Sequence, residues 1–152
     1  MTPGRLSRRV IVDRLSWIER MLGEIRSLPQ RSLDEFLADR RNVWAAESCL
    51  RRSLEAIFDL GRHILAKGFG LGVSDYKEIA ARLGEQGVLL PEEVSLLRVL
   101  AGYRNRLVHF YHEVEMQELY AVCTDQLADL ERITEAYRRW LKEHEEWLNE
   151  TL

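Results

Sequence analysis

Arg104, His109 and Tyr111 fall within one short segment of the sequence, Ala101–Glu113, in the pattern Arg-x4-His-x-Tyr. An arginine binds phosphate through a planar fork of N–H donors, and an imidazole changes charge near neutral pH, which suits it to proton transfer. A tyrosine adds a phenol hydroxyl that donates and accepts hydrogen bonds. Side chains of these three types together suit the binding and cleavage of a phosphodiester.

The spacing of these residues sets a geometric condition if the segment is helical. Residues seven apart lie nearly on one line of a helix, whereas residues five apart are turned by about 140°. Arg104 and Tyr111 therefore share a face, but His109 does not share it with Arg104. Two solutions remain open: the helix loosens after Leu107 and swings His109 back, or two chains pair so that His109 of one meets Arg104 of the other. The second solution predicts an active dimer.

The same side chains also have simpler interpretations. Taken singly, a histidine near a helix end, an arginine and a tyrosine are usually a cap, a surface charge and half-buried packing. A metal site is another alternative, because His109, His112, Glu113 and Glu115 are clustered ligand types. A metal site needs at least three converging ligands, and the preferred interpretation has neither a metal nor a cofactor. Metal analysis of the purified protein distinguishes the two.

Composition restricts the nucleic-acid contacts that the chain can make. The net charge of −3 and the pI near 5.9 argue against a protein that coats nucleic acid by bulk attraction, so any contact with RNA must come from a local patch or a small cleft. Nineteen of the 22 basic residues are arginines, which suit bidentate phosphate contacts. Codon bias in a G/C-rich genome is the simpler explanation of that excess as a whole.

Length and cysteine usage predict a single cytoplasmic domain. Residues 1–152 have the size of one domain with one core. Cys49 and Cys123 have no metal-ligand or Cys-x-x-Cys spacing, and they are expected to be buried thiols in a reducing compartment. The amino-terminal residues lack the apolar region of a signal peptide, and no stretch approaches the roughly 20 apolar residues of a membrane span. No membrane association is therefore expected.

Apolar residues recur every three or four positions along nearly the whole chain, which predicts helices. The fold class expected is all-α: an up-and-down helical bundle with two long and several shorter helices. No window alternates with period two over enough residues to predict a strand. Gly61 lies on the apolar stripe of a long helix, where a missing side chain would let another helix approach closely. The first predicted helix has Pro3 at an early position, carries an apolar stripe from Ile11 to Ile25 and ends at Pro29. The other predicted segments are a turn capped by Ser32, a helix over about 43–64, a helix after Ser74-Asp75 closed by Gly84 and Gly87, a helix from Pro91, and a last helix from about Glu115 nearly to the end.

The motif and the helical frame resemble the HEPN superfamily and, within it, the HepT-like ribonuclease toxins. HEPN ribonucleases carry Arg-x4-6-His, commonly with a polar residue after the arginine, and HepT proteins carry the narrower Arg-x4-His-x-Tyr. Arg104, Asn105, His109 and Tyr111 match each of these positions. The segments Asp59-Leu-Gly-Arg-His-Ile64 and Gly102–His109, with the order of helices, extend the similarity along nearly the whole chain.

The resemblance implies a metal-independent endoribonuclease toxin that cleaves RNA, either tRNA or mRNA, in a cleft between two protomers of a homodimer. Arg104 and His109 would be catalytic and Asn105 supporting. The resemblance also implies a cognate MntA-like nucleotidyltransferase antitoxin that neutralises the toxin by adenylylating Tyr111. The alternative is a non-catalytic HEPN helical module that binds a nucleotidyltransferase partner or a nucleotide. Relatives with a degraded motif look like this, whereas the motif here is complete.

Overall fold

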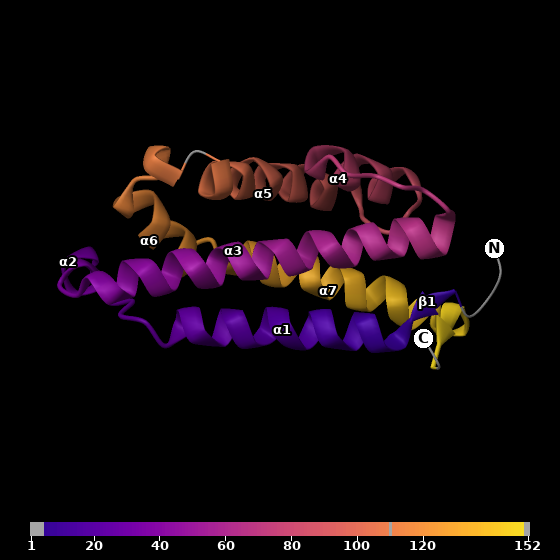
Figure 1. Ribbon diagram of the computed structural model, residues 1–152, viewed down its shortest axis with the longest axis horizontal. Coiled ribbons are helices and arrows are strands. Elements are labelled where there is room, and N and C mark those ends of the chain that lie inside the picture. The colour runs from indigo at the N-terminus through magenta and orange to yellow at the C-terminus, as the bar shows by residue number, and fades with distance from the viewer. Residues whose placement is uncertain (1–4, 110, 151–152) are drawn as a thin grey trace.

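Four helices of 17 to 24 residues run alternately up and down the long axis of the molecule (Figure 1). The computed structural model describes residues 5–109 and 111–150. Within these ranges the elements are, in order, β1 (Leu6–Ser7), α1 (Arg8–Arg26), α2 (Leu33–Leu37), α3 (Arg40–His63), the π-helical segment η1 (Ile64–Gly68), α4 (Tyr76–Glu85), α5 (Pro91–His109), the 3₁₀ turn η2 (Tyr111–Glu113), α6 (Met116–Thr124), α7 (Leu127–Glu143), the 3₁₀ turn η3 (Glu145–Trp147) and β2 (Leu148–Asn149).

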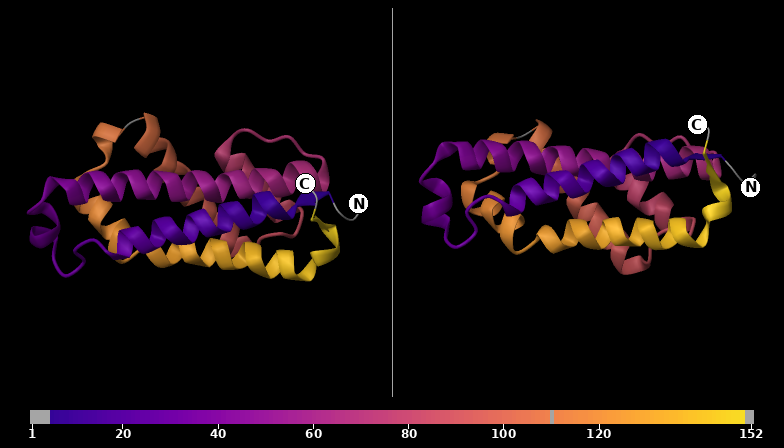
Figure 2. Two further views of the ribbon diagram at one scale, coloured as in Figure 1. Left: turned by 60° about the horizontal axis from the view of Figure 1, so that its bottom comes forward. Right: turned by 90° about the horizontal axis from the view of Figure 1, so that it is seen from below.

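The expected all-α, up-and-down bundle is confirmed, and the structure refines the helix lengths. α3 has 24 residues, and α1, α5 and α7 have 19, 19 and 17. α1 and α3 lie antiparallel along their whole length, with α7 beside them, while α4 and α5 cover the other side of α3 (Figures 1 and 2). The core between them is apolar, and its largest fully buried side chains include Tyr137, Phe36 and Phe58.

Gly61 marks the closest approach of three helices, as its place on the apolar stripe predicted. A Cβ atom at Gly61 would lie 2.7 Å from the Tyr137 hydroxyl oxygen and 3.2 Å from Cγ2 of Ile79. The Tyr137 hydroxyl donates a hydrogen bond of 3.1 Å to the Ile57 carbonyl, one helical turn before Gly61 on α3. The missing side chain therefore makes room for α7 and α4 against α3.

The predicted helix starts are confirmed where a side chain caps them. The Ser32 hydroxyl accepts a hydrogen bond of 3.1 Å from the Glu35 N–H at the start of α2, and the Asp75 carboxylate accepts one of 3.0 Å from the Glu78 N–H at the start of α4. Each bond satisfies an N–H group that the first helical turn leaves unpaired. α1 begins at Arg8, and Pro3, expected early in that helix, lies outside the described residues. The sequence predicts that Gly84 and Gly87 close α4. The helix ends at Glu85, between the two glycines, and Gly87 adopts the left-handed backbone conformation with φ 75°.

The prediction of one continuous last helix is wrong. The chain turns at Asp125 and Gln126, which separate α6 from α7. The Thr124 hydroxyl donates to the Tyr120 carbonyl at 2.9 Å, and the Ala121 carbonyl accepts from the N–H groups of both Asp125 and Gln126. Side-chain bonds to the preceding turn compete with the regular helical pattern, so the apolar period continues while the axis changes direction.

Two very short strands close the bundle at the end where both described chain ends lie (Figure 1). β1 and β2 pair in parallel, with Leu6 opposite Leu148 and Ser7 opposite Asn149. Two residues are too few for an alternating pattern, which explains why the sequence predicted no strand. Among the described residues, no helix is both long enough and apolar enough to cross a bilayer.

Candidate functional site at the carboxyl end of α5

α5 is fixed at its beginning by a buried carboxylate. Glu93 accepts hydrogen bonds of 2.9 and 2.7 Å from the Arg139 guanidinium of α7 and one of 2.8 Å from the Leu90 N–H. The hydrogen bonds from Arg139 hold the pKa of Glu93 below its ordinary value. α5 is one continuous helix, so a contact that fixes its first turn also helps to fix its carboxyl end, which carries the motif.

Arg104 lies on the face of α5 that meets α3. One carboxylate oxygen of Glu55, on α3, accepts a hydrogen bond of 2.8 Å from Nε of Arg104 and forms an ion pair with Nη2 at 2.7 Å. The Arg104 side chain is only 15% exposed, and that of Glu55 is 34% exposed. The pair is therefore shielded from solvent, which makes the charge–charge attraction stronger than it is at an open surface.

Tyr76, at the start of α4, packs against one face of the same guanidinium. The guanidinium carbon of Arg104 lies 4.1 Å from the centre of the Tyr76 ring, and that ring stacks on Phe58 at 4.7 Å. The Tyr76 hydroxyl donates a hydrogen bond of 2.8 Å to the second carboxylate oxygen of Glu55. Burial, together with this hydrogen bond, raises the pKa of Tyr76, so the phenol keeps its proton and remains a donor.

Asn105 completes the contacts around Arg104 from its own helix. Its side-chain oxygen accepts a hydrogen bond of 3.2 Å from Nη1 of Arg104. The guanidinium is therefore held on one edge by Glu55, on one face by Tyr76 and at one nitrogen by Asn105. A planar group fixed in this way presents its remaining N–H donors in a constant direction, which is what bidentate binding of a phosphate requires.

His109 is the last residue of α5 and is exposed to solvent. α5 continues as an α-helix through His109, so the helix does not loosen after Leu107, and that solution to the spacing problem is wrong. His109 and Arg104 of one chain therefore point about 140° apart. The structure brings Arg104 and Asn105 together but leaves His109 on another face of α5. The pairing of two chains stays a prediction.

The backbone of Tyr111 belongs to η2, but its side chain lies outside the part of the chain that the structure describes. The alternative of a metal site receives no support, because no group of three His, Cys, Asp or Glu side chains suited to a metal occurs among the described residues.

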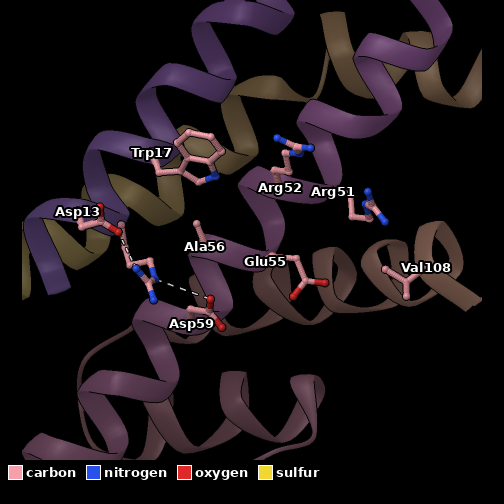
Figure 3. A pocket seen from close by; sticks show the side chains of 9 residues that line it. Asp13, Trp17, Arg51, Arg52, Glu55, Ala56, Asp59 and Val108 are labelled. Atoms are coloured by element: carbon pink, nitrogen blue, oxygen red, sulfur yellow. Dashed lines mark hydrogen bonds and ion pairs between the residues drawn. The ribbon is translucent and has the colours of Figure 1, made fainter.

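A hollow of about 420 Å³ lies between α1 and α3 and is lined by Glu55, the partner of Arg104 (Figure 3). Glu55 lies in its wall, and Val108 of α5 closes one end. Its other lining residues are Asp13, Arg14, Trp17, Arg51, Arg52, Ala56 and Asp59. The sequence motif did not indicate Glu55 or Tyr76, because each is far from Arg104 along the chain.

Comparisons with known proteins find a family model, a relative and solved structures that match this chain. The model of the family described as "Ribonuclease HepT-like" matches residues 18–137. A protein of Aphanizomenon flos-aquae (strain 2012/KM1/D3) named tRNA nuclease HepT is 30% identical over 112 residues, which cover 73% of this chain and 76% of that protein.

Two solved structures share the fold. YutE, a cytosolic protein of Bacillus subtilis, superposes with a TM-score of 0.77 at 21% identity and covers 92% of this chain and 94% of its own. The tri-AMPylated HEPN toxin of Shewanella oneidensis, solved in complex with its MNT antitoxin, gives a TM-score of 0.76 at 20% identity and covers 86% and 97%. At these identities the likeness establishes the helical architecture.

Proposed function

Because the chain belongs to the Ribonuclease HepT-like family, we propose that it is a metal-independent endoribonuclease and the toxin of a toxin–antitoxin pair. The observation that carries this proposal is a complete Arg-x4-His-x-Tyr motif at the end of α5, with the guanidinium of Arg104 fixed by Glu55, Tyr76 and Asn105. The relative named tRNA nuclease HepT favours RNA, either tRNA or mRNA, as the substrate.

In the proposed reaction, the ribose 2′-oxygen attacks the neighbouring phosphorus, and the bond from phosphorus to the 5′-oxygen breaks. His109 takes the proton of the 2′-hydroxyl or gives one to the leaving 5′-oxygen, because imidazole exchanges protons near neutral pH, and water accepts or supplies the other proton. The products are a 2′,3′-cyclic phosphate and a 5′-hydroxyl end. Since the nucleophile belongs to RNA, DNA is expected to resist cleavage.

Arg104 binds the scissile phosphate and stabilises the negative charge that develops on it. Glu55 occupies the Nε–Nη2 edge of the guanidinium, so the phosphate would bind at the Nη1–Nη2 end. Asn105, hydrogen-bonded to Nη1, would orient the same phosphate. Because Arg104 and His109 are turned by about 140° from each other around α5, the proposal includes a homodimer, in which His109 of one chain meets Arg104 of its partner.

Control of the toxin is proposed to act through Tyr111. The Shewanella oneidensis toxin is tri-AMPylated in its complex with an MNT antitoxin. Transfer of an adenylyl group from ATP to the Tyr111 hydroxyl by an MntA-like nucleotidyltransferase would release pyrophosphate and place a second phosphate beside Arg104 and His109. That phosphate would compete with RNA for the same guanidinium and stop cleavage.

The test is induction of this chain alone in a bacterial host, as wild type, Arg104→Ala and His109→Ala, with total RNA examined for new fragments. Wild type should arrest growth and produce fragments, and each variant should lower the cleavage rate by at least about 100-fold. Soluble expression and circular dichroism confirm that the variants fold. A folded wild type that leaves RNA intact, or variants that cut equally well, would instead favour the non-catalytic module that binds a nucleotidyltransferase.

A further inference from the structure

We propose that a trough along α3 binds a single-stranded segment of RNA next to Arg104, with bases stacked on Trp17 and Trp44 and phosphates held by Arg51 and Arg52. This inference rests on the proposed function, because it takes RNA as the substrate. The term "α3 trough" refers to three adjoining hollows that share lining residues.

The three hollows join into one path. The first, of about 420 Å³, and the second, of about 360 Å³, share Arg51 and Val108, and the second and third share Trp44. The α3 residues that line them, from Asp59 down to Arg40, recur every three or four positions and so lie on one side of the helix. At 1.5 Å per residue, this side is about 28 Å long, which is long enough for several nucleotides of a strand.

The lining of the trough has four arginines and four carboxylates, but in the described part of the chain three of the arginines are not paired with those carboxylates. Asp13 pairs with Arg14, Asp59 pairs with Arg14 and Arg62, and Glu55 pairs with Arg104. Among the described residues, no ion pair is formed by Arg51 or Arg52, or by Arg40 at the far end, and all three are exposed. Glu47 is the other carboxylate in the lining. Exposed arginines along a groove are the electrostatic component of single-strand binding.

Two tryptophans supply the flat apolar surfaces that unpaired bases need. Trp44 is 62% exposed, which is unusual for so large an apolar side chain in a bundle with a well-filled core. Trp17 is half-buried and, with Arg52, lines the first hollow (Figure 3). The guanidinium carbon of Arg20 lies 5.6 Å from the centre of the Trp17 ring. Stacking on aromatic rings is tolerant of base identity and requires bases that are not already paired, so a single strand fits and a duplex does not.

The trough passes directly beside the proposed catalytic arginine. Glu55 is both a wall of the first hollow and the partner of Arg104. Val108, which lies one helical turn after Arg104 on α5, lines the first and second hollows. A strand lying in the trough would therefore bring one of its phosphates to Arg104 while its neighbours contact Arg51 and Arg52. The protein would then bind the RNA on both sides of the scissile bond.

Binding is tested with a fluorescein-labelled, fully 2′-O-methylated 12-mer, which lacks the 2′-hydroxyl nucleophile and is not consumed by the proposed reaction. Fluorescence anisotropy gives its affinity for the wild-type protein and for Arg51→Ala/Arg52→Ala over a range of salt concentrations. The double variant should bind about tenfold more weakly, and the slope of log K against log salt should fall in magnitude by about 1.4, or 0.7 for each lost phosphate contact. The charge-matched control is Arg9→Ala/Arg31→Ala, which removes two exposed arginines outside the trough.

Stacking is tested by comparing leucine with phenylalanine at the same positions. Trp44→Leu and Trp17→Leu should each weaken binding about fivefold or more, whereas Trp44→Phe, which keeps an aromatic face, should retain most of the affinity. A surface that docks another protein through apolar contact would leave RNA affinity unchanged in all of these variants. That result, or a loss in the Arg51/Arg52 variant no larger than in its control, overturns the proposal.

Cleavage of unmodified RNA is measured in parallel, so that the trough and the proposed function are judged separately. If wild type binds the 12-mer through the trough but cuts no RNA, the trough stands and the nuclease proposal fails. If wild type cuts RNA and the trough variants bind and cut as it does, the nuclease proposal stands and the trough fails. Thermal melting by circular dichroism establishes that each variant is folded before it is compared.

Discussion

At the scale of single residues, Arg104 is unusual in how completely its guanidinium is positioned. Glu55 holds one edge, Asn105 one nitrogen and Tyr76 one face, and Tyr76 is in turn bonded to Glu55. A surface arginine samples many rotamers, and ordering it on binding costs free energy. Here that ordering takes place when the protein folds, so in the proposed reaction the phosphate would meet a group that is already placed.

Glu55→Gln is expected to lower kcat for RNA cleavage by about 10- to 100-fold, because loss of the carboxylate charge lets the Arg104 guanidinium move by a fraction of an ångström. KM should stay equal or fall, since a neutral amide competes less with phosphate for the same guanidinium. A purely structural role would not separate kcat from KM in this way. Steady-state kinetics of both parameters on a labelled oligoribonucleotide provide the measurement.

The matched control is Tyr76→Phe, which keeps the ring under Arg104 and removes only the hydroxyl that bonds to Glu55. Its effect on kcat should be smaller than that of Glu55→Gln. Equal kinetic constants in wild type and Glu55→Gln would show that Glu55 does not position Arg104 for the reaction.

A local sequence pattern indicates the motif residues, but it does not indicate the side chains that contact Arg104 from other helices. Arg104, Asn105 and His109 occur together in the chain, so a local pattern indicates them. Glu55 is 49 residues from Arg104. In the sequence it is a single polar residue between Leu54 and Ala56, with no sign that it contacts Arg104. Contacts of this kind depend on how α3 and α5 pack, which no local pattern contains.

At the scale of secondary-structure elements, Glu93 ties the start of α5 to α7. The residue is 4% exposed, and its hydrogen bonds from Arg139 hold its pKa below the ordinary value. The carboxylate form is therefore favoured by folding. Its contribution to the free energy of unfolding is present above the ordinary glutamate pKa and is lost as the pH falls through the lowered value.

Glu93→Gln is expected to lower the free energy of unfolding by about 2 kcal/mol near neutral pH, since the variant leaves the Arg139 charge without its partner. At about pH 4 and below, the difference between wild type and variant should shrink, because protonation removes the same charge from the wild type. Urea unfolding at each pH measures both values.

Glu92→Gln, at an exposed neighbouring position, is the control and should change stability by less than about 0.5 kcal/mol. A gap that stays constant across this pH range would contradict the assignment.

Helix breaks were the least predictable part of the fold. The apolar residues Leu119, Cys123, Leu127 and Leu130 keep one helical period across residues 124–127 and are all buried, so the pattern indicated one helix. The turn between α6 and α7 comes instead from hydrogen bonds made by Thr124 and by the N–H groups of Asp125 and Gln126. An apolar period records which side of a segment faces the core, and two helices that pack on the same core share it.

At the scale of the whole molecule, the continuity of α5 has a direct consequence for assembly. A helix that runs unbroken to His109 keeps the imidazole away from Arg104 of the same chain. Each site in the proposed homodimer therefore takes Arg104 from one chain and His109 from its partner. In a two-fold symmetric dimer this arrangement occurs twice.

A cis–trans test distinguishes shared sites from sites within one chain. Arg104→Ala and His109→Ala chains are refolded together in equal amounts, and random pairing makes half of the dimers mixed. If sites are shared, each mixed dimer has one intact site of two, and the mixture should recover about one quarter of wild-type activity from two inactive variants. If each site lies within one chain, neither chain has an intact site, and the mixture should stay inactive.

The reciprocal mixture, wild type with the Arg104→Ala/His109→Ala double variant, contains the same number of alanines and serves as the control. Shared sites predict about one quarter of the activity of pure wild type, which comes from the wild-type dimers alone, because every site in a mixed dimer lacks one group. Sites within one chain predict about one half, since every wild-type chain then keeps its activity whatever its partner. The two mixtures thus give equal activities if Arg104 and His109 meet across the dimer. If they do not, the mixture of single variants has no activity, and the mixture with the double variant has one half of the wild-type activity. Activities of zero and one half would require His109 to leave the helical position that α5 gives it, and the active conformation would then differ from this structure.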